Sequence, residues 1–357
     1  MSEHSLKLTP TDSNVLKGVA LIFLLIHHLF YIRNGKFDDI EIYNGEGLVN
    51  MIGQACKVCV PMFVFLSGYG LTAAAEKLEK INIRQFYVHR FSKLYLNYWL
   101  IYILFVPIGV FTLDITFDKV YGDHMIEKAT LDFFGLLNLT GNLGYNPTWW
   151  FYSCITVLYL LFPLIMTMCR NKIGMHVLLW GSVALILCPI GAIQPIRWYL
   201  LTFILGCYFR NGLIGNLLPP PIKSLGIRTI QGNLTSWGTV ALVSVTILSI
   251  PVRFMIPYAL VFDTVITILL VLCFKNIKLH PYLSKSLEFC GRHSFNIFLF
   301  HTFLFYLYIP QIIYWHRNPI IILITLLLLC IPISMVIEYG KKKLGYYRLL
   351  KIINSKF

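Results

Sequence analysis

A lysine and two histidines share one apolar segment near the start of the chain, VLKGVALIFLLIHHLF, residues 15–30. Lys17 and His28 are eleven residues apart, which in an α-helix is about 20° more than three full turns, so both side chains point the same way. The same spacing separates them by about 16 Å along the helix axis, and His27 points about 100° away from His28. Imidazole accepts a proton near neutral pH, and this makes His28 a candidate general base. The alternative is that His28 only makes a hydrogen bond between packed helices.

A second group of candidate residues lies in the cationic and aromatic stretch NIRQFYVHRFSKLY, residues 82–95. Arg90 and Lys93 are i, i+3 neighbours on a helix, and together with Arg84 they are suited to grip the phosphates of a polyanion. Cations mixed with aromatic rings also predict an interfacial amphipathic helix. The alternative for this cluster is therefore contact with lipid headgroups alone.

Three further polar or aromatic residues lie in or at the ends of apolar runs. Asp263 must face the protein interior with a partner, and we expect Lys57 or a histidine to pair with it, either as a structural ion pair or at a substrate site. His301 either lines the path of an acceptor substrate or only packs between helices. Trp149 belongs either to an aromatic belt at the membrane surface or to a surface that stacks against a sugar.

The composition indicates that membrane helices position these residues. Of 357 residues, 57% are hydrophobic and only 13% are charged, about half the charge content of a soluble domain. The net charge of +14 comes from short cationic clusters between apolar runs, which is typical of cytoplasmic loops and argues against nucleic-acid binding. The nine cysteines form no disulfide or zinc pattern, because the single CxxC at Cys56 and Cys59 lacks a second pair. We expect no metal and no resident cofactor.

The apolar runs predict an all-α polytopic membrane protein, with about ten transmembrane helices in one bundle and a single integral membrane domain over residues 1–357. Segments on one side of this arrangement carry most of the Lys and Arg residues, so both termini are expected to be cytoplasmic. Tight turns are expected at Gln194-Pro195 and at Pro251. The expected spans are 15–32, 48–74, 94–112, 148–168, 176–194, 197–210, 236–252, 254–274, 294–314 and 319–339.

Five stretches in register resemble the membrane-bound acyltransferase 3 family. LKGVALIFLLIHHL is similar to its first helix, whose motif of Arg or Lys, ten residues and then His matches Lys17 and His28. The other four stretches are VPMFVFLSGYGL (60–71), HRFSKLYLNYW (89–99), NPTWWFYSCITVLYLLFP (146–163) and GRHSFNIFLFHTF (291–303). The chain departs from the family pattern at Asn14 and Pro61, where many members have Asp, and at Lys93, which replaces an Arg and cannot bind phosphate in a bidentate way.

The resemblance implies transfer of an acyl group, usually acetyl, from cytoplasmic acyl-CoA to a hydroxyl of an envelope carbohydrate or related acceptor. It implies His28 as the general base, and a donor site that includes Arg84, Arg90 and Lys93. We expect Lys17, Trp149, Asp263 and His301 to contribute to substrate binding. The implied location is a cell membrane, in particular the bacterial cytoplasmic membrane, which the chain crosses several times.

Two other functions remain open at this stage. Scattered intramembrane charges also suit a proton-coupled transporter or flippase without acyl-transfer chemistry, although we find no paired half-repeats of the kind that many carriers have. A structural or regulatory membrane protein that keeps the scaffold without activity is the third possibility. Acyl transfer from a labelled donor separates the enzyme from both alternatives.

Overall fold

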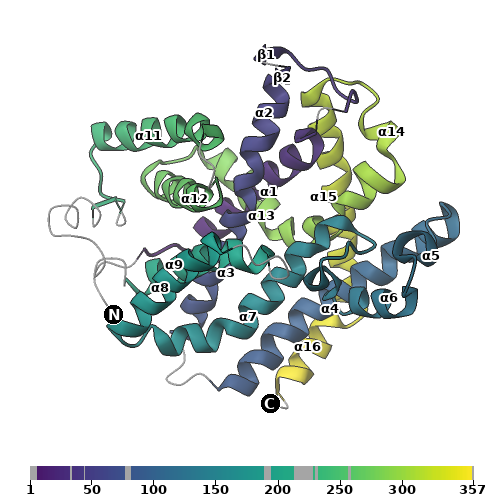
Figure 1. Cartoon of the computed structure of the whole chain (residues 1–357), viewed down its shortest axis with the longest axis horizontal. Helices are drawn as coiled ribbons and strands as arrows, with labels where there is room; N and C mark the ends of the chain where they lie inside the picture. Colours follow the sequence, from purple (N-terminus) through teal and green to yellow (C-terminus); the bar gives the residue numbers. More distant parts are fainter. Residues whose placement is uncertain are drawn as a thin grey trace.

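The computed structural model describes residues 6–32, 34–43, 45–76, 82–188, 194–212, 228–229, 232–255 and 259–355, and within these residues it is a helical bundle with one short β-hairpin (Figure 1). The hairpin pairs β1 (Glu41–Tyr43) with β2 (Glu46–Gly47) in antiparallel orientation. The helices are α1 (Pro10–Phe30), α2 (Leu48–Ala55), α3 (Cys59–Ala75), α4 (Ile83–Thr112), α5 (Phe117–Tyr121), α6 (Met125–Phe133), α7 (Trp150–Met168), α8 (Lys172–Leu187), α9 (Gln194–Asn211), α11 (Ser236–Met255), α12 (Ala259–Asn276), α13 (Pro281–Thr302), α14 (Pro310–Ile313), α15 (Pro319–Lys343) and α16 (Tyr346–Ser355). Short turns complete the fold: the 3-10 turns η1 (Cys56–Val58), η2 (Leu137–Thr140) and η3 (Pro147–Trp149), and the π-helical turn η5 (Phe303–Tyr308).

Six segments of the described chain are long and apolar enough to cross a membrane. This confirms the expected all-α membrane protein, because a segment of about 20 apolar residues matches the thickness of the hydrocarbon core. The count of ten spans and the cytoplasmic position of both termini stay predictions. The six segments are Pro10–Phe30, Leu48–Ala75, Ile83–Thr112, Pro147–Met168, Ser236–Phe254 and Pro319–Lys343.

Among the element boundaries that differ from the sequence prediction, two involve candidate residues. The expected interfacial helix at 82–95 and the span at 94–112 form one continuous helix, α4, which begins where the Asn82 side chain accepts a hydrogen bond from the Gln85 N–H. The expected turn at Pro251 is wrong, because α11 continues through Pro251 to Met255. Membrane helices tolerate an internal proline when neighbouring groups satisfy the freed backbone carbonyl.

Helices α1 and α13 pack against each other through two glycines at one end of the pair. A Cβ on Gly18 would collide with the carbonyl oxygen of Leu287, and a Cβ on Gly291 would collide with the carbonyl oxygen of Asn14. Small residues allow such close approach of membrane helices. At the other end of the pair His28 meets His301, so the two helices run parallel.

A second close pair stands beside the first. Gly68 on α3 contacts the backbone of Phe203 on α9, and Gly206 on α9 contacts the backbone of Phe65 on α3. This explains the small residues of the SGY stretch without a chemical role for them. Figure 1 shows α1 and α13 near the middle of the bundle, with α11 and α12 to one side and α4, α5 and α6 to the other.

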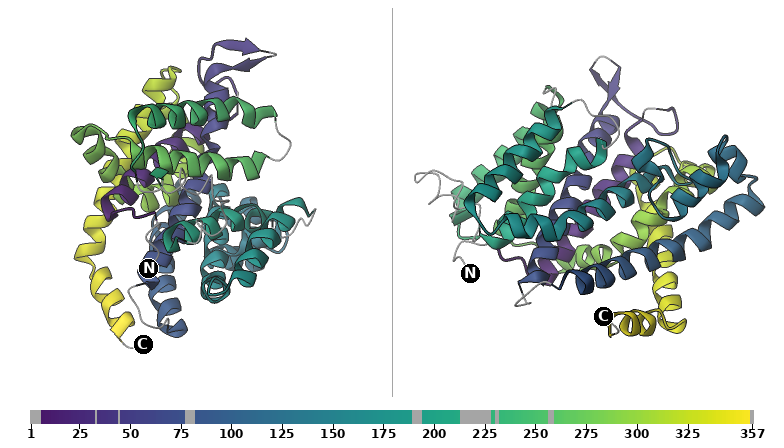
Figure 2. Two further views of the ribbon diagram at one scale, coloured as in Figure 1. Left: turned by 90° about the vertical axis from the view of Figure 1, so that its left-hand side faces the viewer. Right: turned by 60° about the horizontal axis from the view of Figure 1, so that its bottom comes forward.

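The β-hairpin and α16 lie at opposite ends of the bundle in all three views (Figures 1 and 2). The hairpin follows the C-terminal end of α1, whose last turn carries His27 and His28. Helix α16 follows the cationic end of α15, which carries Lys341, Lys342 and Lys343. The bundle therefore separates a histidine end from a cationic end.

The segment between α4 and α7 folds back as α5 and α6 and is anchored by one buried carboxyl group. Asp132 is 1% exposed, and its Oδ2 accepts hydrogen bonds of 2.7 Å from the Tyr121 hydroxyl and from the Tyr145 N–H. The backbone carbonyl of Asp132 accepts a further bond from the Tyr98 hydroxyl of α4, at 2.6 Å. Burial outweighs these hydrogen bonds and raises the pKa of Asp132 to about 6.

Replacing Asp132 by Asn should remove one source of pH-dependent stability. Because the folded-state pKa is above the unfolded value of about 3.9, the folded protein binds the proton more tightly, so this stabilisation is complete below about pH 4 and is lost as pH rises through 6. The shift corresponds to about 3 kcal/mol. We expect the thermal unfolding temperature in detergent to decrease when the pH is raised from 4.5 to 7.5, and to decrease by more in the wild type than in Asp132→Asn. The amide oxygen of the variant can still accept both hydrogen bonds. Equal pH responses would contradict the assignment.

Candidate active site

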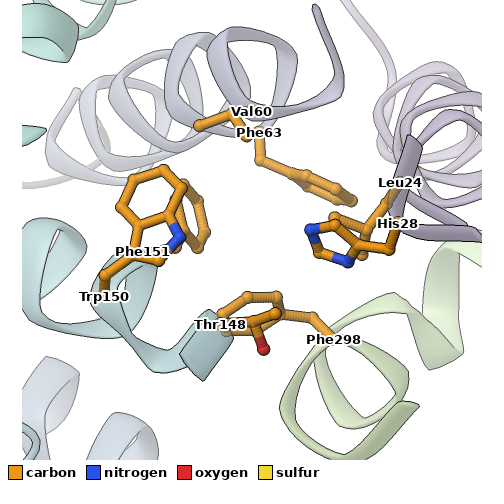
Figure 3. Close-up of a pocket in the computed structure, with 8 residues that line it drawn as sticks. All are labelled: Leu24, His28, Val60, Phe63, Thr148, Trp150, Phe151 and Phe298. Carbon is orange, nitrogen blue, oxygen red and sulfur yellow. The ribbon is translucent and has the colours of Figure 1, made fainter. Parts of the chain in front are cut away.

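A small cavity lies between the close pair of helices α1 and α13, helix α3 and the start of α7. Its volume is about 10 Å³, which is room for about one water molecule. Figure 3 shows the His28 ring directed into this space, with Phe63 beside it and Trp150 and Phe151 across from it. The residues that line the cavity are Leu24 and His28 of α1, Val60 and Phe63 of α3, Thr148, Trp150 and Phe151 at the start of α7, and Phe298 of α13.

His28 is held by the other histidine of the predicted site. Its Nδ1 lies 2.6 Å from Nε2 of His301, and the two rings are stacked, with centroids 4.9 Å apart and planes 7° from parallel. This contact occupies Nδ1 of His28. The nitrogen left for the cavity is Nε2, which contacts no hydrogen-bonding group among the described residues.

His27 has a different environment, as the helical spacing predicts. Its Nδ1 lies 2.8 Å from the carbonyl oxygen of Gly53 on α2, and its ring packs 5.0 Å from the ring of Tyr31. Gly53 itself touches the backbone of Phe30 and Tyr31, where a Cβ would not fit. His27 thus joins the end of α1 to α2 and does not line the cavity.

The start of α7 is fixed to α13 by buried polar contacts. Asn146 is fully buried, accepts a hydrogen bond of 2.7 Å from the Thr148 hydroxyl, and reaches the Leu299 carbonyl oxygen at 3.3 Å. The Thr148 and Thr302 hydroxyls are 3.0 Å apart. These contacts fix the far wall of the cavity to the same helix that carries His301.

The adjacent residues Trp149 and Trp150 have different environments. Trp149 is fully buried, donates a hydrogen bond of 2.9 Å from its indole N–H to the Leu299 carbonyl, and packs on Tyr98. Trp150 lines the cavity instead and stacks on Tyr199. Trp149 is therefore part of the core and not of an exposed aromatic belt. The sequence signal for the cavity wall was present in the stretch NPTWWFY.

Of the predicted cations, Lys17 and Lys93 approach each other away from the histidine end of α1. Lys17 and Lys93 are close enough for their charges to repel, and Lys93 is similarly close to Lys341. Arg90 turns toward the bundle interior, where its charge interacts with the Tyr159 hydroxyl of α7. Arg84 is exposed in the first turn of α4. Lys341 is 3% exposed and bonds Asn296 and Glu338 at 2.8 and 2.6 Å.

The prediction for the partner of Asp263 was wrong. Asp263 is 1% exposed and forms a two-pronged ion pair with Arg253 of α11, in which one nitrogen–oxygen distance is 3.1 Å. Neither Lys57 nor a histidine takes this position. The error follows from the turn expected at Pro251, which put Arg253 in an outer loop, whereas the continuing helix keeps it inside the bundle. The carboxylate is thereby fully engaged in holding α12 to α11.

Across the ranges that the structure describes, no group of three or more His, Cys, Asp or Glu side chains is arranged to hold a metal ion. At the cavity only two imidazoles meet, and their mutual contact uses one nitrogen of each. The chemistry that this arrangement can perform is proton transfer at Nε2 of His28.

Comparison with known proteins gives one match. A family model described as an acyltransferase domain, Acyl_transf_3, matches residues 11–339, which include every residue of the cavity and of the cationic end apart from Lys341 and the residues that follow it. No curated protein and no solved structure matches the chain.

Proposed function

The chain belongs to the acyltransferase 3 family of membrane proteins, and we propose that it transfers a small acyl group, acetyl, from acyl-CoA to a hydroxyl of an envelope carbohydrate or related acceptor. His28 is the general base. The observation that carries this assignment is the position of the His28 ring, which is held by His301 on one side and directed into a cavity on the other.

The chemical step needs a single proton acceptor at that position. A hydroxyl becomes a useful nucleophile as its proton moves to a base within hydrogen-bond reach. Nε2 of His28 takes up the proton of the acceptor's hydroxyl group. At the same time, the oxygen of that hydroxyl group forms a bond to the acyl carbon. The bond from that carbon to the sulfur of CoA breaks, and the proton on His28 then passes to the departing sulfur.

The size of the cavity supports acetyl as the acyl group. A space with room for about one water needs the least side-chain movement to admit the smallest acyl group. Phe63, Phe151 and Phe298 form its walls, and they would have to move further for each added methylene. Close packing makes such movement costly.

The charge distribution supports a donor that enters from the cationic end. Lys17, Arg90 and Lys93 are suited to bind the phosphates of CoA, since charge-assisted contacts to phosphate are strong. His28 lies about 16 Å further along α1, so the flexible arm of the donor runs between α1 and α4 toward the cavity. The acceptor approaches from the histidine end, and the protein works in a cell membrane, which in this proposal is the bacterial cytoplasmic membrane.

Purified protein in lipid nanodiscs should release CoA from labelled acetyl-CoA in the presence of an acceptor extract, and His28→Ala should reduce this turnover about 10²- to 10⁴-fold. His27→Ala is the matched control on the same helix. It loses the contact to Gly53, which costs about 0.5–1.5 kcal/mol of stability, and the packing on Tyr31, and it should keep most of the turnover. Equal loss in both variants would refute the role of His28, and absence of acyl transfer in the wild type would favour the transporter.

Replacing Arg90 by Ala should raise the apparent KM for acetyl-CoA. Loss of one charge-assisted contact costs about 1.5–3 kcal/mol, which is about a 10- to 150-fold change in affinity. Lys172→Ala is the control, because Lys172 is an exposed cation at the start of another helix. An unchanged KM in Arg90→Ala, with the protein still folded, would contradict the donor site. The cations Lys17, Arg90 and Lys93 would then only set the orientation of the chain in the membrane.

Replacing Phe63 by Ala should relax the choice of acyl group. Each methylene in an apolar pocket is worth about 10- to 200-fold in specificity, so we expect the ratio of butyryl to acetyl transfer to rise at least tenfold. Phe111→Ala is the control, because it also removes a phenyl group but at a residue that is 85% exposed. It should leave the ratio unchanged. A ratio that stays constant in Phe63→Ala would show that another surface selects the acyl group.

A further inference from the structure

We infer that His301 is a positioning residue, which fixes the proton of His28 on Nδ1 and thereby keeps the Nε2 lone pair directed at the cavity. That this positioning serves catalysis rests on the proposed function. The placement of the proton itself follows from geometry alone. No motif used in the sequence analysis assigns this task to His301.

The backbone of α13 fixes the tautomer of His301. Nδ1 of His301 lies 2.9 Å from the carbonyl oxygen of Ile297 and 3.0 Å from that of Phe298. Carbonyl oxygens only accept hydrogen bonds, so Nδ1 of His301 must carry a hydrogen. In a neutral imidazole the other nitrogen then has a lone pair, which makes Nε2 of His301 an acceptor.

The second step passes this constraint to His28. Its Nδ1 lies 2.6 Å from the lone pair of His301 Nε2, and it must therefore donate. The hydrogen of neutral His28 thus resides on Nδ1, and Nε2 is the free base. The tautomer of a catalytic histidine is commonly set by the hydrogen bond that its other nitrogen makes.

His301 does not line the cavity but lies behind His28. The side chain is fully buried and stacks on Phe305 in the π-helical turn η5, with ring centroids 5.8 Å apart. π-helical turns are uncommon and often lie at functional sites. The ring cannot swing into the cavity without breaking its contacts to the Ile297 and Phe298 carbonyl oxygens.

The same geometry stabilises the charge that His28 acquires. When Nε2 accepts the proton of the hydroxyl, His28 becomes an imidazolium whose Nδ1–H points at the lone pair of His301. The two carbonyl oxygens at the far nitrogen of His301 polarise that ring and strengthen its acceptor. The proton leaves from Nε2 to the sulfur of CoA, so His301 returns to its starting state without net change.

Two variants of His301 separate positioning from packing. His301→Gln places an amide oxygen near the position of Nε2 and can still accept from His28, whereas His301→Leu cannot. We expect His301→Leu to lower kcat at least tenfold with little change in KM for either substrate, and His301→Gln to retain most of the activity. Rescue by Gln and not by Leu is the outcome that a packing role would not produce.

Nitrogen NMR of ¹⁵N-histidine-labelled protein gives a readout that does not depend on activity. The His28 signals, identified by their loss in His28→Gln, should show a protonated Nδ1 and a bare Nε2 in the wild type and in His301→Gln, and a mixture of tautomers in His301→Leu. His293→Leu, on the same helix but bonded to Ser334, should leave the His28 signals unchanged. A bare Nδ1 on His28 in the wild type, or the same tautomer in His301→Leu, would overturn the inference even if acyl transfer is confirmed; the expected tautomers without acyl transfer would overturn only the proposed function.

Discussion

The contact between α1 and α13 at Gly18 and Gly291 is the constraint on which the site depends. Two helix backbones that touch at this point, and that run parallel, bring His28 opposite His301 about three turns further along. A side chain at either glycine would push the helices apart, and a separation of 1–2 Å would break a contact of 2.6 Å. The helix pair is therefore the scaffold of the proton acceptor, and α3 and the start of α7 add walls to it.

The walls belong to two further elements with separate anchors. Helix α3 supplies Phe63 and is locked to α9 by a second pair of glycines. The start of α7 supplies Thr148, Trp150 and Phe151 and is tied to α13 through Asn146 and Thr302. The cavity is consequently mostly apolar, and its polar groups belong to His28, Thr148 and the indole of Trp150. An apolar wall keeps His28 as the principal hydrogen-bonding group that a reacting hydroxyl meets, which suits a base whose task is to accept one proton.

Much of this organisation could be predicted from the sequence because it depends on local patterns. Apolar runs predicted membrane helices, and the helical period separated His28 from His27 correctly. The period could not reveal that His301 faces His28, because that contact joins residues 273 positions apart and depends on how two helices cross. The partner of Asp263 could not be predicted for a related reason: Pro251 predicts a turn, whereas α11 continues and brings Arg253 inside. Trp149 and Trp150 are adjacent, and composition alone does not tell which one faces a cavity.

The central claim is that the acyl carbon reacts beside Nε2 of His28 while the phosphates of the donor stay at the cationic end. Cryo-electron microscopy of the protein in nanodiscs with a non-hydrolysable acetyl-CoA analogue measures both positions at once. The account predicts the acetyl group between Phe63, Phe151 and His28, with its carbonyl carbon near Nε2 and with the phosphates near Lys17, Arg90 and Lys93. An acetyl group bound away from the His28 cavity, with phosphates at the same cations or elsewhere, would contradict it.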